Sequence, residues 1–323
     1  MAHDTERIMI TGAAGQIGSE LAAALRKRHG AENVVVTDIV APASQATENG
    51  PFAVVDVTDR AGLGSALRRY RIDTVYHLAA ILSATGEKNP QKAWAINIGG
   101  LYTVLEAGRE IGLKRIFTPS SIAVFGPATP RIRTPQDTNL DPTTMYGVTK
   151  VAGEHLCDYY VRKYGLDVRG CRFPGIISHM TPPGGGTTDY AVAIFYEAVR
   201  SGRYTCFLRE DTSLPMMYMP DCLKSILDLM AADPARLRHH SNFNVTAMSF
   251  TAGELAAEIR KHIPGFVCEY VPDFRQAIAD SWPTSIDDSA AREEWGWRPD
   301  HDIASMTADM LAALNKRKSE GRL

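Results

Sequence analysis

Hydrophobic positions in the first part of the chain follow two different spacings, which predict a strand followed by a helix. The apolar run at residues 8–10 is too short for a helix and is typical of a strand buried on both faces. From Ile17 the spacing changes, because Leu21 and Leu25 follow at intervals of four residues, as on one face of a helix. Gly30 is a C-terminal stop for this helix. The chain therefore opens with a strand, a glycine-containing turn and a helix.

The same succession of strand and helix patterns continues as far as residue 173. We expect further strands over residues 34–38, 52–56, 74–78, 115–118 and 167–172, and further helices over residues 60–70, 90–111 and 146–164. The stretches 41–51 and 127–142 are expected as loops. Strands that alternate with helices form right-handed βαβ units, so this part of the chain predicts an α/β fold with a doubly wound parallel sheet.

The regular alternation stops at Pro174. The segment P-G-I-I-S-H-M-T-P-P-G-G-G-T-T-D, residues 174–189, is expected as a loop. A helix should follow from about Thr188 to Ser201, with Thr187 or Thr188 as its N-cap and Gly202 as its stop. Later helices are expected over residues 221–232, 252–262 and 305–315. We place the start of a smaller region that covers the substrate site at this change of pattern.

Three glycines, Gly12, Gly15 and Gly18, mark the turn between the first strand and the first helix. Their spacing, G-x-x-G-x-x-G, differs from the G-x-G-x-x-G dinucleotide fingerprint, and an ordinary α/β turn is the alternative. In a dinucleotide site they would allow a tight turn, a close approach of backbone to phosphate, and packing of helix on strand. Asp38 ends the second strand twenty residues after Gly18, where a ribose hydroxyl needs an acceptor. Because a carboxylate repels a 2′-phosphate, the pattern predicts NAD in preference to NADP.

Composition narrows the function classes. The 323 residues carry a net charge of −2 with acids and bases interspersed, so neither nucleic acid nor a membrane surface is expected as a partner. There is no apolar run long enough to span a membrane, and the first residues, M-A-H-D-T-E-R, show no signal-peptide pattern. The five cysteines and nine histidines show no metal-ligand spacing. We therefore expect reduced thiols, a cytoplasmic location and no metal.

Tyr146 and Lys150 are the main candidates for chemistry. Residues four apart share a helix face, so this phenol and this ammonium can point at one ligand. A phenol has a pKa near ~10, which a nearby ammonium and a positive nicotinamide ring would lower toward that of a usable base. Tyr159 and Lys163 repeat the spacing, but thirteen residues at roughly 100° each place Tyr159 on a largely opposed face. We choose Tyr146 because it lies at the start of the helix beside a loop.

Ser120 and Ser121 follow the strand expected at residues 115–118. They lie at the carboxyl end of the sheet, where open α/β folds bind their ligands. A hydroxyl here could hydrogen-bond the substrate oxygen opposite Tyr146, although serines after strands are also common turn formers.

Taken together, these motifs resemble the extended short-chain dehydrogenase/reductase superfamily, which has a Rossmann fold. The segments that carry the resemblance are 11–18 (T-G-A-A-G-Q-I-G), 56–57, 77–80 (H-L-A-A), 97–100 (N-I-G-G), 120–121 and 146–150 (Y-G-V-T-K). The run W-G-W-R-P at residues 295–299 is similar to the C-terminal signature of the sugar-nucleotide epimerase branch.

The resemblance implies a role for each matching residue. Tyr146 would be the acid/base, Lys150 would lower its pKa and hold the nicotinamide ribose, and Ser121 would orient the substrate. The residues implied in binding NAD are Tyr146, Lys150, Gly12, Gly15, Gln16, Ile17, Asp38, Asp56, Val57, Leu78, Ala79, Ala80 and Asn97. It also implies a homodimer formed through two helices.

The second half of the chain must select the substrate. The glycines at residues 184–186 before a helix could form a small anion nest, or they could form a flexible hinge. The runs P-G-G-G-T-T-D-Y, L-P-M-M-Y-M-P and D-S-W-P resemble the short-chain type L-threonine 3-dehydrogenases. That resemblance implies a substrate pocket built by Tyr146, Ser121, Ser83, Gly186, Thr187, Thr188 and Trp282.

The sequence thus predicts an NAD-dependent oxidation of the L-threonine C3 hydroxyl. Residues 1–173 would form the NAD-binding domain, with a return segment near 215–247, and residues 174–323 would form a smaller, partly interleaved α/β substrate region with a lid over 175–189. A UDP-sugar 4-epimerase or dehydratase would use the same tyrosine, lysine and NAD. A catalytically silent NAD-binding protein is a second alternative.

Overall fold

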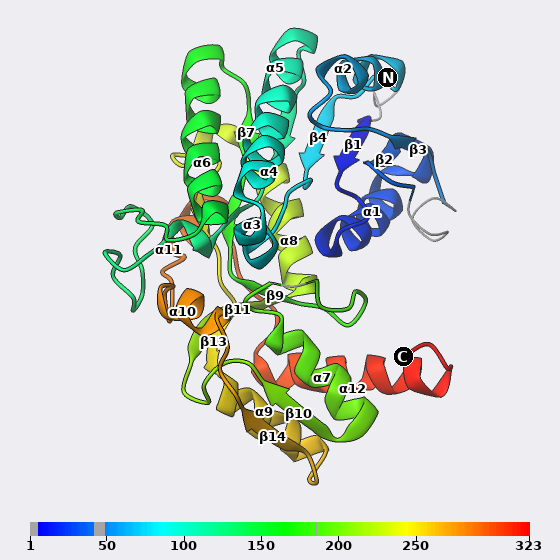
Figure 1. Cartoon of the computed structure of the whole chain (residues 1–323). Coiled ribbons are helices and arrows are strands. Elements are labelled where there is room, and N and C mark those ends of the chain that lie inside the picture. Colours follow the sequence, from blue (N-terminus) through cyan, green and yellow to red (C-terminus); the bar gives the residue numbers. More distant parts are fainter. Residues whose placement is uncertain (1–5, 42–48, 185) are drawn as a thin grey trace.

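A parallel sheet forms the centre of the larger part of the molecule in this computed structural model, which describes residues 6–41, 49–184 and 186–323 (Figure 1). Its strand order is β3-β2-β1-β4-β5-β7, and every neighbouring pair is parallel. The strands are β1 (Ile8–Thr11), β2 (Val34–Asp38), β3 (Phe52–Val54), β4 (Thr74–His77), β5 (Arg115–Phe117) and β7 (Val168–Arg169). The doubly wound α/β fold expected from the sequence is confirmed. Of the expected loop 41–51, residues 42–48 lie outside the described residues.

Two of these strands continue after short breaks. β6 (Ser120–Ser121) follows β5, β8 (Cys171–Phe173) follows β7, and β12 (Phe243–Asn244) pairs with β8. The strand expected over 167–172 is therefore interrupted, and the interruption lies at Gly170. A Cβ atom at Gly170 would lie 2.1 Å from the Thr118 carbonyl oxygen, so only glycine allows this close approach. β6 thus carries two serines beyond the carboxyl end of β5.

Helices cover both faces of the sheet, and alternate strand residues face them in turn. α1 (Gln16–His29) and α8 (Met219–Ala231) pack over Ile8 and Ile10. α2 (Arg60–Arg69), α5 (Leu101–Ile111) and α6 (Met145–Tyr164) bury Met9 on the other face. Residues 8–10 are all apolar because β1 has a hydrophobic core against each face of the sheet.

The helix expected over 90–111 is present but not uniform. It consists of α4 (Pro90–Trp94), a π-helical segment (Ala95–Gly100) and α5. Asn97 in the π segment hydrogen-bonds the backbone of Ile81, which explains why the wider turn occurs here. A short helix, α3 (Ser83–Lys88), was not expected, since its sequence has no apolar periodicity.

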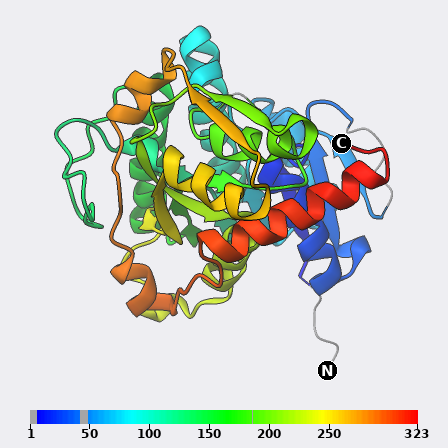
Figure 2. The same cartoon turned by 90° about the horizontal axis from the view of Figure 1, so that it is seen from below.

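Most of the remaining elements form a smaller lobe next to the carboxyl ends of the strands (Figure 1). β9 (Gly175–Ile177), β11 (Ser213–Tyr218) and β13 (Met248–Thr251) form one sheet, and β10 (Arg203–Cys206) pairs with β14 (Val267–Tyr270). α7 (Tyr190–Ser201), α9 (Ala252–His262) and α12 (Ile303–Ser319) share an apolar core, and α12 lies across this lobe in Figure 2. α10 (Arg275–Asp280) also belongs to this lobe, whereas α11 (Ser289–Trp295) packs beside β12 in the larger part.

Two boundaries of this lobe differ from expectation. Residues 175–177 form strand β9 rather than loop, because they pair in parallel with β11 over three residues, a pairing that a run this short does not reveal. α7 begins at Tyr190 and its N-cap is Asp189, not Thr187 or Thr188. Within the described residues, no helix combines the length and apolar character that a membrane span requires.

Candidate active site

The glycine turn after β1 packs closely against the end of β4. Gly12 has φ of +69°, and a Cβ atom on it would lie 2.6 Å from the Ala79 nitrogen. A Cβ atom on Gly18 would lie 2.4 Å from the Gly12 carbonyl oxygen, so α1 starts in direct contact with the turn. Gly15 is the N-cap of α1, and the first turn of α1 contains no acidic residue. The positive end of α1 is therefore available to an anionic group.

Two carboxylates predicted for the adenosine end lie at the carboxyl ends of their strands or just beyond. Asp38 accepts hydrogen bonds from the backbone N–H groups of Ala14 (3.0 Å) and Ile39 (2.8 Å), which fixes it beside the glycine turn. Asp56 accepts hydrogen bonds from the hydroxyl and the N–H of Thr58, and these lower its pKa. Val57 beside it is buried.

Asn97 fixes the segment that follows β4. Its side chain accepts the Ile81 N–H (2.8 Å) and donates to the Ile81 carbonyl (3.0 Å) and to Thr149 Oγ1 (3.1 Å). Leu78, Ala79 and Ala80 therefore have a defined position between the glycine turn and α6.

A cavity of 240 Å³ lies between the glycine turn, α6 and the smaller lobe. The predicted residues that line it are Gly12, Gly15, Gln16, Ile17, Leu78, Ala80, Ser83, Ser121, Tyr146, Lys150, Gly186, Thr187, Thr188 and Trp282. Ala79 and Asn97 instead line a neighbouring cavity of 30 Å³, together with Lys150. Asp38, Asp56 and Val57 line neither cavity. The structure therefore brings the predicted catalytic and substrate residues to one place.

The start of α6 presents Tyr146 to this cavity. Thr144 caps the helix by accepting the Gly147 N–H (3.0 Å), which places Tyr146 in its first turn. Ser121 hydrogen-bonds the Tyr146 phenol from β6. Lys150 Nζ lies 5.5 Å from the centre of the Tyr146 ring and donates to the Pro119 carbonyl oxygen (2.6 Å).

Burial dominates the acid–base properties of these groups. It raises the pKa of Tyr146 to about 12, and the hydrogen bond from Ser121 acts in the opposite direction. Burial lowers the pKa of Lys150 to about 8, against the attraction of Cys157 and Glu154. The Tyr–Lys spacing predicted a low pKa for the Tyr146 phenol, but the protein's own groups do not produce it. A positive charge from a bound ligand is needed to lower the pKa of Tyr146.

The second Tyr–Lys pair lies away from the cavity. Tyr159 is half exposed and packs edge-on against Tyr160 and Tyr164 on the outer side of α6. The rotation of the helix thus separates the two pairs in the way that the spacing predicted.

The loop before α7 could form an anion nest or a hinge, and the structure describes the hydrogen bond of one of its N–H groups, at Gly186. The Gly186 N–H donates to the Asp189 carboxylate (2.8 Å), so an acidic side chain already occupies that donor. Gly185 lies outside the described residues. Thr187 is only 1% exposed, and its Oγ1 has no hydrogen-bond partner in the described part of the chain. An unsatisfied hydroxyl at the wall of a cavity is a ready contact for a polar ligand.

Comparison with known proteins agrees with this geometry. Residues 8–246 match the model of the NAD dependent epimerase/dehydratase family. The chain belongs to this family. A protein of Staphylococcus haemolyticus named as an uncharacterized epimerase/dehydratase is 52% identical over 315 residues, which are 97% of this chain and 99% of that protein.

Two solved structures are similar over almost the whole chain. The L-threonine dehydrogenase from Clostridium difficile is 50% identical with a TM-score of 0.95, covering 97% of this chain and 98% of that chain. The GalE-like L-threonine dehydrogenase from Cupriavidus necator, in its holo form, is 52% identical with a TM-score of 0.93, covering 95% and 99%. The resemblance found in the motifs is therefore confirmed.

NAD is the cofactor of this family, and the glycine turn fits it. Gly12 and Gly18 stand where a Cβ atom would clash with backbone, and α1 offers its N-terminus without an acidic residue in the first turn. Asp38 is held at the edge of the same turn by two N–H groups.

Sequence reasoning missed one charged residue of the cavity. Asp189 lines the cavity, and the run T-T-D before an apolar helix was the signal that could have identified it. Arg172, which precedes the substrate region in the sequence, is 3% exposed and paired with Glu154.

Proposed function

We propose that the protein is an NAD-dependent L-threonine 3-dehydrogenase, which oxidises the C3 hydroxyl of L-threonine to 2-amino-3-oxobutyrate. The observation that carries the proposal is the composition of the 240 Å³ cavity. It is lined by Tyr146, Lys150 and Ser121, and among the described lining residues the charged ones are Lys150 and Asp189. The two solved L-threonine dehydrogenases described above support it, since they are 50% and 52% identical to this chain.

In the proposed reaction Tyr146 removes the proton from the C3 hydroxyl of threonine. NAD supplies the hydride acceptor, so C3 loses a hydride and its hydroxyl becomes a carbonyl. Ser121, which hydrogen-bonds the Tyr146 phenol, orients the reacting oxygen. Lys150 contributes a positive charge 5.5 Å from the Tyr146 ring and stabilises the phenolate.

The other end of the cavity fits a small zwitterion. Asp189 favours the α-ammonium group of an amino acid, and the hydroxyls of Ser83, Thr187 and Thr188 offer hydrogen bonds to the rest of it. Trp282, only 4% exposed, closes one side of the cavity. Residues 178–184 and 186–189, between β9 and α7, would cover the bound substrate and exclude water.

The same features argue against the two alternatives. A UDP-sugar carries a diphosphate, which arginine side chains usually bind through paired hydrogen bonds, and no arginine is among the described residues that line the cavity. A silent NAD-binding protein would not need Tyr146, Lys150 and Ser121 at one site.

The test measures NADH formation, by its absorbance, with a panel of 3-hydroxy amino acids. L-Threonine should be oxidised, and UDP-glucose and UDP-galactose should neither react nor compete. Competitive inhibition by either UDP-sugar at micromolar concentration would instead establish the epimerase alternative. NAD binding without any turnover would establish the silent one.

We further propose that the protein is a cytoplasmic homodimer. Trp94, Tyr102, Val148, Tyr159 and Tyr164 are exposed on the neighbouring helices α4, α5 and α6, an apolar surface suited to a second copy. All five cysteines, each within the described residues, are free thiols, as is typical of a reducing compartment. Sedimentation equilibrium tests the dimer, and Tyr159→Glu should convert it to a monomer.

A further inference from the structure

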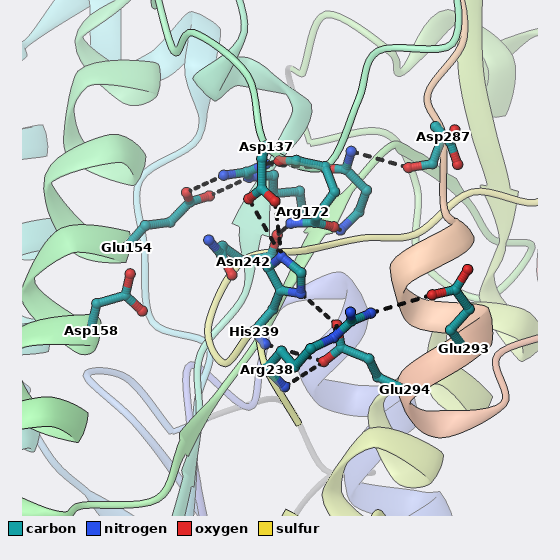
Figure 3. Close-up of polar contacts among 12 residues, drawn as sticks. Asp137, Glu154, Asp158, Arg172, Arg238, His239, Asn242, Asp287, Glu293 and Glu294 are labelled. Carbon is teal, nitrogen blue, oxygen red and sulfur yellow. Dashed lines mark hydrogen bonds and ion pairs between the residues drawn. The ribbon is translucent and has the colours of Figure 1, made fainter. Parts of the chain in front are cut away.

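A buried ion pair lies behind the active site, on the same face of α6 as the catalytic residues. Tyr146, Lys150 and Glu154 follow at intervals of four residues and so share that face. Glu154 is 4% exposed and Arg172 on β8 is 3% exposed. Two parallel hydrogen bonds of 2.9 Å and 2.8 Å join the guanidinium to the carboxylate (Figure 3). Such paired bonds fix the orientation of both side chains.

The Glu154 carboxylate also holds the strand that carries the catalytic serine. Ser120 Oγ donates a hydrogen bond to Glu154. Ser120 lies beside Arg172 in the register of β6 and β8, so both donors reach the carboxylate from adjacent strands. Ser121 follows Ser120 directly in this two-residue strand, so the contact of Ser120 with Glu154 restrains the backbone that positions Ser121.

A second link runs through the small cavity behind Lys150. Its volume of 30 Å³ is enough for about one water molecule, and Ser120, Lys150 and Glu154 all line it. The groups that face Lys150 are Tyr146, Glu154 and Cys157 on α6, and His77 at the end of β4. Burial keeps His77 neutral by lowering its pKa to about 3, and burial raises the pKa of the Cys157 thiol. Glu154 is therefore the carboxylate that acts on Lys150, although it also holds Arg172.

We propose that Glu154 is a positioning residue of the active site, which aligns Ser121 through Ser120 and stabilises the Lys150 ammonium by its charge. The proposal rests on the proposed function, since it takes Tyr146, Lys150 and Ser121 as the catalytic group. It predicts two separable effects, one on alignment and one on the protonation of Lys150.

A purely structural role is the competing explanation. Arg172 also donates to the Gln136 carbonyl (2.8 Å) and to Asn244 Oδ1 (3.3 Å), so the ion pair joins α6 to a surface loop and to β12. If stability were the whole function, removing a contact of Glu154 would lower the melting temperature without a specific effect on kcat. The variants must therefore distinguish catalysis from stability.

Ser120→Ala tests the alignment, because it removes one hydroxyl and leaves the ion pair in place. Its matched control is Tyr160→Phe, since Tyr160 donates a hydroxyl (2.6 Å) to Glu106, a carboxylate that Arg109 also holds. We expect kcat of Ser120→Ala to fall by about 10-fold, within the range for small displacements of catalytic groups, with KM for NAD and the melting temperature near wild type. Tyr160→Phe should keep the wild-type kcat. Equal kcat values for the two variants would overturn the alignment role.

Glu154→Gln tests the charge in enzyme without added NAD. Competitive acetylation across pH, followed by mass spectrometry, measures the protonation of Lys150 directly. Removing the carboxylate removes an attraction that raises the pKa of Lys150, so Lys150 should become reactive at lower pH than in wild type. Ser120→Ala, which changes no charge, should leave this reactivity unchanged. An unchanged profile for Glu154→Gln would overturn the charge role.

Two further variants keep the outcome decisive. If Glu154→Gln does not fold, the double variant Glu154→Gln/Arg172→Met, which removes both charges, takes its place. Tyr146→Phe separates the two proposals. Full activity of Tyr146→Phe would contradict the proposed function. If Tyr146→Phe is inactive but Ser120→Ala keeps the wild-type kcat, only the role of Glu154 is contradicted.

Discussion

Replacing Tyr146 by phenylalanine is the most direct test of the proposed chemistry. The ring remains, so its packing beside Lys150 and at the start of α6 is kept, and the proton acceptor is lost. With a phenol pKa of about 12, only about one molecule in 10⁴ carries the phenolate at pH 8, a cost of roughly 5 kcal/mol. The positive charges of bound NAD and Lys150 must offset this cost by stabilising the phenolate. The phenylalanine variant has no hydroxyl, so no phenolate can form. We therefore expect kcat to fall by about 10²- to 10⁴-fold.

The assay is NADH formation with saturating L-threonine, together with the melting temperature of each variant. Tyr159→Phe is the control, because Tyr159 has the same spacing to a lysine but is half exposed on the outer side of α6. It should retain the wild-type kcat. If both variants lost activity equally, or neither did, the assignment of Tyr146 as acid/base would be wrong.

Wild-type kcat/KM should also rise with pH across the neutral range, because burial keeps Tyr146 protonated; a profile independent of pH would contradict this. Gly12→Ala should abolish NAD binding in calorimetry, since its Cβ atom would lie 2.6 Å from the Ala79 nitrogen; unchanged affinity would show that the turn is not the cofactor site. Asp38→Ala should reduce the preference for NAD over NADP, measured as the ratio of kcat/KM values, and an unchanged ratio would contradict the role of Asp38. Thr187→Val should raise KM for threonine by about 2- to 10-fold with little change in kcat, and because Oγ1 has no partner among the described residues it should not lower the melting temperature.

Features that depend on local spacing could be predicted from the sequence. The strand at residues 8–10, the glycine turn and the position of Asp38 each follow from a few neighbouring residues. Helix rotation separated Tyr146 from Tyr159, and the position of Tyr146 at the start of its helix beside a loop decided between them. The structure places only Tyr146 of the two at the 240 Å³ cavity.

Features that depend on strand pairing could not be predicted in this way. The sequence does not show what Arg172 contacts, because the pairing of β6 with β8 places it beside Ser120, where it pairs with Glu154. The strand at residues 175–177 is similar, because its three residues are defined only by their partners in β11. In both cases the deciding contact joins segments distant in the sequence.

The loop before α7 shows how a local rule can fail while the functional conclusion is strengthened. Backbone N–H groups before a helix attract anions, so the glycines before Thr187 suggested a site for a ligand carboxylate. Asp189 supplies that anion itself, since its carboxylate accepts the Gly186 N–H at 2.8 Å. The loop therefore adds a negative charge to the cavity, which favours a ligand with an ammonium group and disfavours a diphosphate. Asp189, which the sequence argument did not assign, therefore supports an amino acid substrate without any need for an anion nest.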